Sequence, residues 1–153
     1  MISNNIFNIN SISLDNEFKT KKEVFNFITD YFFKNGFSIN KKDLLDGFYA
    51  REEEGSTAFT DGIGIPHSKV DAIVKPGIFV LKIKEGIEWE SMDDKKTFFF
   101  ISLAIPNNNY DELHLKMLSS IARKLVDPIF KNNLLLAKDK ETIYKIVSEV
   151  EIK

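Results

Sequence analysis

The sequence contains only two histidines, and the first, His67, stands in the stretch GIGIPHSK. A neutral imidazole is nucleophilic near neutral pH, and it can form a covalent intermediate at one ring nitrogen while a hydrogen bond holds the other. Pro66 restricts the backbone ahead of the ring, and Gly62 and Gly64 leave room for a partner surface to approach. This context favours a histidine that carries a phosphoryl group, although an ordinary loop histidine with local hydrogen bonds fits the same residues.

The second histidine, His114, lies near the start of a stretch with helical periodicity. A helix beginning near Asn109 places its ring in line with an apolar face formed by Leu118, Ile121 and Leu125. The free amides and dipole of a helix N-terminus favour a neutral imidazole and attract an anion. His114 could therefore assist an anionic group bound nearby, or it could be a packed, hydrogen-bonded core histidine.

A third candidate is Arg51, in the stretch AREEEGST. A guanidinium can hold a phosphoryl group with two hydrogen bonds and offset its charge, which lysine does less specifically. The run of glutamates at residues 52–54 is equally typical of a solvated charged surface. Ser56 and Thr57 could donate hydroxyl groups to phosphate oxygens, or they could form a turn with Gly55.

Several other chemistries are excluded or weakly supported by the residue types. The sequence has no cysteine, which excludes disulfides, thiolate zinc sites and thiol nucleophiles. It has no G-x-x-x-x-G-K-[ST] loop, no H-E-x-x-H and no G-x-S-x-G. His67 and Asp71 have a spacing that could supply two metal ligands, but no third ligand is evident. We expect no metal and no cofactor.

Length indicates one domain over residues 1–153, and the charge balance gives no general attraction to polyanions, although it leaves room for a local basic patch. The net charge is -2, so no overall field attracts nucleic acid or an anionic membrane. The N-terminal stretch has no basic residue before Lys19 and no long apolar region, unlike a secretory signal. The longest apolar stretch, residues 98–105, is too short to span a bilayer as a helix. We expect a cytoplasmic protein that binds no nucleic acid and does not insert into a membrane.

Periodicity predicts an α/β fold, with a mixed central sheet of about five strands and helices on both faces. The stretch TFFFISLAI is continuously apolar, as in a central strand buried on both faces. Asn40 is a candidate N-cap for the helix predicted over residues 41–53. The predicted strands are residues 12–14 (at an edge), 63–66, 77–83 and 97–105, and the predicted helices are residues 21–35, 41–53, 109 onward, 128–137 and 140–150.

Three segments in this order, AREEEGSTAFTDGIGIPHSK, KPGIFVLKIKEGIEWESMDD and HLKMLSSIARKLVDPIF, carry a family resemblance. The sequence resembles the enzyme IIA proteins of the bacterial phosphoenolpyruvate-dependent sugar phosphotransferase system, in the fructose/mannitol class (type 2 EIIA). The likeness covers about residues 18–147, and it rests on the combination of R-E-x-x-G-S-T, I-P-H, G-I-x-W and a second histidine that opens a long helix.

The resemblance implies a phosphotransferase component with a phosphohistidine intermediate. The residue matching His67 accepts a phosphoryl group from the histidine-containing phosphocarrier protein HPr and passes it to a IIB component. The residue matching His114 supports the transferring group, and the one matching Arg51 helps to neutralise its charge. In this class the IIB acceptor is a cysteine, so the IIB component, and through it the membrane permease IIC, would be a separate chain or domain.

The resemblance leaves three functions open. The first is a phosphocarrier for sugar uptake, of the fructose type. The second is a regulatory IIA-like protein of the nitrogen-regulatory type, whose phosphorylation state controls other proteins. The third is a binding module that keeps the fold but not the transfer, and the joint presence of His67, His114 and Arg51 argues against it.

Overall fold

The computed structural model describes residues 1–107 and 113–153, with side chains for all of these except Leu113 and His114. Within these residues five strands form one mixed sheet, as predicted. Strands β4 and β5 pair antiparallel, and the other pairs are parallel. The strands are β1 (Ile12–Asn16), β2 (Ile63–Gly64), β3 (His67–Val70), β4 (Gly77–Ile87) and β5 (Thr97–Pro106).

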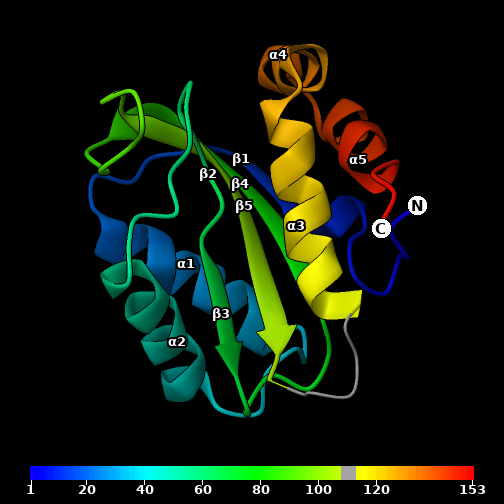
Figure 1. The fold of residues 1–153 in the computed structure, drawn as a ribbon. Coiled ribbons are helices and arrows are strands. Elements are labelled where there is room, and N and C mark those ends of the chain that lie inside the picture. The colour runs from blue at the N-terminus through cyan, green and yellow to red at the C-terminus, as the bar shows by residue number, and fades with distance from the viewer. Residues whose placement is uncertain (108–112) are drawn as a thin grey trace.

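Helices cover both faces of this sheet (Figure 1). Helices α1 and α2 lie on one face, and α3, α4 and α5 lie on the other, so the predicted α/β architecture is confirmed. Asn40 caps α2 as expected, because its side chain accepts a hydrogen bond from the Asp43 amide at 3.0 Å. The helices are α1 (Lys21–Lys34), α2 (Lys41–Glu53), α3 (Leu113–Val126), α4 (Pro128–Leu136) and α5 (Lys140–Ser148), and a short 3-10 helix spans Ile9–Ser11.

The two faces of the sheet bury different kinds of side chain. The core under α1 and α2 is rich in aromatic rings, and the core under α3 to α5 is mainly aliphatic. Strand β5 contributes to both cores, which explains why its sequence is apolar without alternation. The buried aromatic residues of the first core are Phe25, Phe32, Phe37, Phe48, Phe79, Trp89 and Phe100.

The segment that contains His67 differs from the prediction. A single strand over residues 63–66 was expected, but β2 ends at Gly64 and a separate strand, β3, begins at His67. Both pair with β5, and Ile65 and Pro66 interrupt them. Proline has no amide hydrogen to donate, yet its carbonyl still accepts from the Leu103 amide at 3.0 Å. The chain therefore continues along β5 and places His67 opposite Leu103.

Helix α2 packs closely on β3 because Gly47 has no side chain. A Cβ at Gly47 would clash with Ser68 and would lie 2.7 Å from Val70 Cγ1. The fully buried Ser68 hydroxyl donates to the Leu44 carbonyl of α2 at 3.0 Å. Since Arg51 lies one helical turn beyond Gly47, this contact brings the end of α2 to the start of β3.

The N-terminal residues, which the sequence did not assign to an element, belong to the fold. Phe7 is fully buried and stacks on Tyr144 of α5, with 5.7 Å between ring centroids. The Ile2 amide donates to the Ser148 carbonyl at 2.8 Å. In the described part of the chain no helix is both long and apolar enough to cross a membrane.

Candidate functional site

The imidazole of His67 is half-buried at the start of β3 and is held at both nitrogens. Its Nδ1 lies 2.9 Å from the Ile65 carbonyl oxygen. A carbonyl can only accept, so the hydrogen-bond network assigns the ring hydrogen to Nδ1. Nε2 then carries a lone pair, which accepts a hydrogen bond from Arg51 Nε at 3.2 Å. The nitrogen available for nucleophilic attack is therefore Nε2.

The surroundings of His67 keep the ring neutral. Burial lowers the pKa of His67 below its usual 6.5, and the positive charge of Arg51 lowers it further. The hydrogen bond to Ile65 and the charges of Glu52 and Glu54 oppose this shift but do not cancel it. At neutral pH the imidazole is thus in its nucleophilic form.

Arg51 projects from the last turn of α2. Besides the contact with His67, its Nη1 donates to the Gly55 carbonyl oxygen at 2.7 Å. The structure therefore brings together two of the predicted site residues, Arg51 and His67, from elements that are separated by a loop. The guanidinium lies where it can hold an anion at Nε2.

Ser56 and Thr57 use their hydroxyl groups locally. Ser56 donates to the Glu90 carbonyl, and Thr57 donates to the carboxylate of Glu52. A hydroxyl group has one hydrogen, so either side chain would have to leave its present acceptor before it could donate to a phosphoryl oxygen. Their role in phosphate binding stays a prediction.

The backbone of His114 lies in the first turn of α3, but its side chain is outside the described residues. Residues 108–112, where the predicted helix was expected to begin, lie wholly outside the described residues. Further along α3, Ile121 and Leu125 are buried and Leu118 is partly buried, so the predicted apolar face is confirmed there. That the imidazole rings of His67 and His114 lie close together stays a prediction.

Metal binding gains no support among the described residues, which contain no cluster of three or more candidate ligands. Asp71, considered above as a ligand, instead accepts a hydrogen bond from Asn107 Nδ2 at 2.9 Å.

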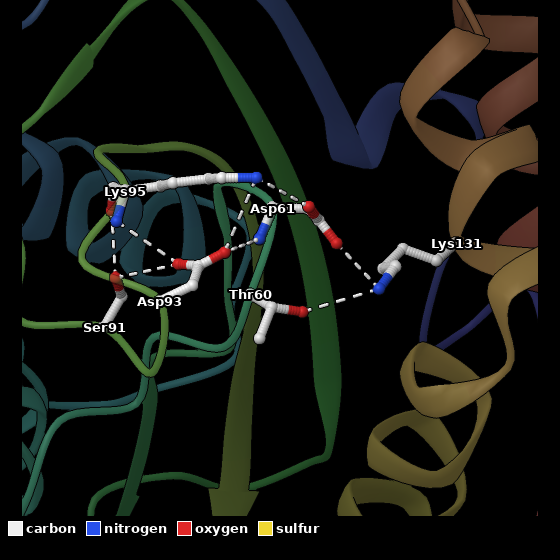
Figure 2. A network of polar contacts seen from close by, with 6 residues as sticks. All are labelled: Thr60, Asp61, Ser91, Asp93, Lys95 and Lys131. Carbon is white, nitrogen blue, oxygen red and sulfur yellow. Dashed lines mark hydrogen bonds and ion pairs between the residues drawn. The ribbon is translucent and has the colours of Figure 1, made fainter.

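Sequence reasoning missed a second polar cluster, which holds the loop ahead of β2 (Figure 2). Asp61 pairs with Lys131 of α4 at 2.7 Å and with Lys95 at 3.2 Å. Its backbone amide donates to Asp93 at 2.9 Å. Nothing in the local sequence indicates these contacts, because the partners are distant along the chain.

Comparison with known proteins supports the resemblance. The family model for the phosphoenolpyruvate-dependent sugar phosphotransferase system, EIIA 2, matches residues 5–150. A fructose-specific EIIA component from Haloferax volcanii is 33% identical over 91% of this chain and 90% of its own length. A fructose-specific EIIABC component from Bacillus subtilis is 26% identical over 91% of this chain, which spans only 22% of that longer protein.

Solved structures show the same fold. The nitrogen regulatory protein IIA-Ntr from Neisseria meningitidis aligns over 94% of this chain and 97% of its own, with a TM-score of 0.84 and 25% identity. The IIAMTL–phosphorylated IIBMTL complex from Escherichia coli aligns over 92% of this chain and 96% of that chain, with a TM-score of 0.75 and 20% identity. The chain belongs to the EIIA 2 family of phosphotransferase components of the phosphoenolpyruvate-dependent sugar phosphotransferase system.

Proposed function

We propose that this protein is a phosphocarrier that accepts a phosphoryl group on Nε2 of His67 from HPr and passes it to a IIB component for sugar uptake and phosphorylation. The observation that carries the proposal is the pair of hydrogen bonds on the ring. Nδ1 donates to Ile65, and Nε2 presents its lone pair toward a guanidinium. A neutral ring with a lone pair on Nε2 and an adjacent cation suits phosphoryl acceptance.

The transfer step needs no group beyond the two proteins. The Nε2 lone pair attacks phosphorus, the P–N bond in the HPr phosphohistidine breaks, and its electron pair returns to the HPr ring. The hydrogen on Nδ1 of His67 remains in place. There the carbonyl of Ile65, 2.9 Å away, offsets the positive charge that the ring gains as the new bond forms.

Arg51 would stabilise the transferred group. Its Nε is 3.2 Å from Nε2, so the incoming phosphorus displaces this hydrogen bond and the guanidinium donates to phosphoryl oxygens instead. Charge stabilisation and in-line positioning supply most of the catalysis in phosphoryl transfer. We further propose that the His114 ring supports the same group from the N-terminal turn of α3.

Two relatives support the choice of partners. The Bacillus subtilis protein is an EIIABC component, and the Escherichia coli structure is a complex of IIAMTL with phosphorylated IIBMTL. We propose that this chain likewise transfers to a IIB cysteine on another chain or domain, and through it serves a IIC permease. Exchange with HPr would place the protein in the cytoplasm. The Haloferax volcanii relative favours fructose as the transported sugar.

A regulatory role is the second candidate. The likeness to a nitrogen regulatory IIA protein, at a TM-score of 0.84 and 25% identity, favours it. The chemistry at His67 is the same in both cases, and the destination of the phosphoryl group differs.

Labelling with phosphorylated HPr tests the proposal. Radioactive phosphate should appear on the wild-type protein and be absent from His67→Ala, while Lys69→Ala, an exposed position on the same strand, should label normally. Label on His67→Ala, or none on the wild type, would overturn the proposal. Addition of purified IIB should then remove the label, whereas retention of the label would favour the regulatory role.

A further inference from the structure

Glu52 is placed quite differently from the other two glutamates of the run at residues 52–54. Its carboxylate accepts hydrogen bonds from the Thr57 amide, at 3.3 Å from each oxygen, and from the Thr57 hydroxyl. It also accepts from the indole Nε1 of Trp89 at 3.2 Å. Three donors from two separate segments thus converge on one side chain, whereas Glu53 and Glu54 are exposed.

The first consequence of this arrangement concerns Arg51, which donates to Nε2 of His67. The Gly55 carbonyl, which receives Arg51 Nη1, belongs to the short turn between Glu52 and Thr57. On one side, the Gly55 amide donates to the Glu52 carbonyl at 3.2 Å. At the other end of the turn, the amide and the hydroxyl of Thr57 donate to the Glu52 carboxylate. Glu52 therefore holds both ends of the turn that orients Arg51.

The second consequence concerns Ile65, whose carbonyl oxygen is the partner of Nδ1. The Thr57 carbonyl accepts from the Ile65 amide at 3.0 Å, and the Ile65 carbonyl is the group that binds Nδ1 of His67. A continuous series of contacts thus runs from Glu52 through Thr57 and Ile65 to the ring. The Nδ1 contact thus leads back to the Glu52 carboxylate, and the Nε2 contact leads to the Gly55 turn, whose far end Thr57 holds on that same carboxylate.

The geometry points to Glu52 as the positioning residue of the site, a role that rests on the proposed function of His67. We infer that its carboxylate, by holding Thr57, keeps the Ile65 carbonyl on Nδ1 and the guanidinium of Arg51 at Nε2. It thereby maintains the tautomer with the nucleophilic lone pair on Nε2. The hydrogen bonds on the ring are made with Ile65 and Arg51 and not with Glu52. Apart from its charge, which raises the pKa of His67, Glu52 therefore acts through its neighbours.

Trp89 provides a rigid anchor for this carboxylate. It is only 5% exposed, and its ring packs edge-on against Phe25 at 5.5 Å and at a tilt against Phe100 at 5.1 Å between centroids. A buried indole N–H requires an acceptor, and Glu52 is that acceptor. The aromatic core thus fixes the position of Glu52, and Glu52 in turn fixes the turn at residues 55–57.

These contacts give Thr57 a role other than the predicted one of binding phosphate. Its side chain is buried, 3% exposed, and its hydroxyl donates to Glu52. Its carbonyl and amide belong to the series of contacts just described. We assign Thr57 to positioning together with Glu52.

The first test compares Glu52→Gln with Glu53→Gln. The glutamine at residue 52 has nearly the same shape, but its NH2 group faces amide, hydroxyl and indole donors in place of an acceptor oxygen. We expect phosphoryl transfer from HPr to His67 to slow on the order of tenfold to a hundredfold, since small misplacements cost this much. Glu53→Gln removes the same charge from an exposed neighbour and should transfer at the wild-type rate.

The decisive readout is the tautomer of His67 in the unphosphorylated protein, read from the 15N chemical shifts of its imidazole. The wild type and Glu53→Gln should show hydrogen on Nδ1, and Glu52→Gln should show a mixture of tautomers. A Glu52→Gln variant that keeps both the Nδ1–H tautomer and the wild-type rate would overturn the inference. The measurement needs no phosphoryl donor, so it stands even if the wild-type protein fails to accept a phosphoryl group and the proposed function falls.

A second pair of variants covers the case in which Glu52→Gln does not fold. Thr57→Val removes the hydroxyl and keeps the size of the side chain, and Thr57→Ser restores the hydroxyl. We expect the valine variant to slow transfer and shift the tautomer, and the serine variant to recover both. If both variants behave as the wild type, or if the serine variant fails equally, the positioning role is wrong.

Discussion

Two polar clusters hold the loop between α2 and β2, and they are built differently. The imidazole cluster consists of Arg51, Glu52, Thr57 and His67. The lysine cluster consists of Asp61, Asp93, Lys95 and Lys131 together with the Thr60 and Ser91 hydroxyl groups (Figure 2). In the first, a neutral ring is held by one cation and one carbonyl. In the second, carboxylates face ammonium groups, and the Lys95 side chain is 62% exposed.

The difference indicates which cluster is suited to react. Neighbouring lysines lower the pKa of Asp61, and backbone donors lower the pKa of Asp93, so both carboxylates stay ionised near neutral pH and are paired with ammonium and amide groups. The ion pairs of the exposed Lys95 contribute little and are screened by salt. The imidazole cluster presents a lone pair instead. Both clusters fix the loop, but only the first places a reactive nitrogen beside a cation.

The largest expected effect comes from Arg51. Arg51→Ala removes the cation beside Nε2, and we expect the rate of phosphoryl transfer from HPr to fall on the order of a hundredfold, as when a preorganised charge donor is lost. Arg51→Lys should recover only part of the rate, because lysine cannot donate in the same bidentate geometry. Rapid-quench measurement of labelled protein checks this. An unchanged rate in Arg51→Ala would remove the functional distinction between the clusters.

The next effect concerns the docking of α2 on β3. Gly47→Ala places a methyl group against Ser68 and Val70, and we expect the free energy of unfolding to drop by roughly 1–3 kcal/mol. Asp46→Ala, at the exposed neighbouring position, serves as the control and should change stability little. Urea unfolding gives both values. Equal stability of the two variants would mean that α2 can move away from β3 at no cost.

A smaller effect is expected in the pH dependence of stability. Burial lowers the folded-state pKa of His67, so below about 6.5 the unfolded chain binds a proton that the folded protein does not. The contribution of His67 to stability is therefore complete above this pH and is lost as the pH falls toward its folded-state pKa. The difference in unfolding free energy between wild type and His67→Gln should decline over this window. A difference that grows on acidification would show that the ring is stabilised in its charged form.

The smallest effect should follow Lys131→Met. The aliphatic part of the side chain is retained, and only the contacts with Asp61 and Thr60 are lost. We expect a slight loss of stability that disappears near 1 M salt, where the screening length is about 3 Å. Phosphoryl transfer should proceed at the wild-type rate. A transfer defect as large as that of Arg51→Ala would mean that the lysine cluster belongs to the reaction site.

The sequence predicted the elements whose signals are local. Helices α1 and α2 have apolar residues at helical spacing, Asn40 marks the start of α2, and β5 is continuously apolar, so their bounds were predicted to within one residue. Strand β3 was missed because its four residues, HSKV, show no strand pattern and pair with β5 only through tertiary contacts. Pairings between distant segments override local propensity.

The candidate site was predictable to a similar extent. His67 and Arg51 could be chosen from residue type, and a family resemblance links them. Glu52 could not be separated from its exposed neighbours, because Trp89, the buried donor that holds it, lies 37 residues away. The choice between the two ring nitrogens was likewise hidden, since it depends on the backbone carbonyl of Ile65.

The most direct test of the account is to identify the phosphorylated nitrogen. The phosphorylated protein, labelled with 15N in its histidines, gives 15N and 31P spectra that distinguish the two isomers of phosphohistidine. We predict one phosphorylated residue, His67, with phosphorus on Nε2 and the hydrogen still on Nδ1. Phosphorus on Nδ1, or on a residue other than His67, would contradict the central claim that the Ile65 carbonyl reserves Nε2 for the reaction.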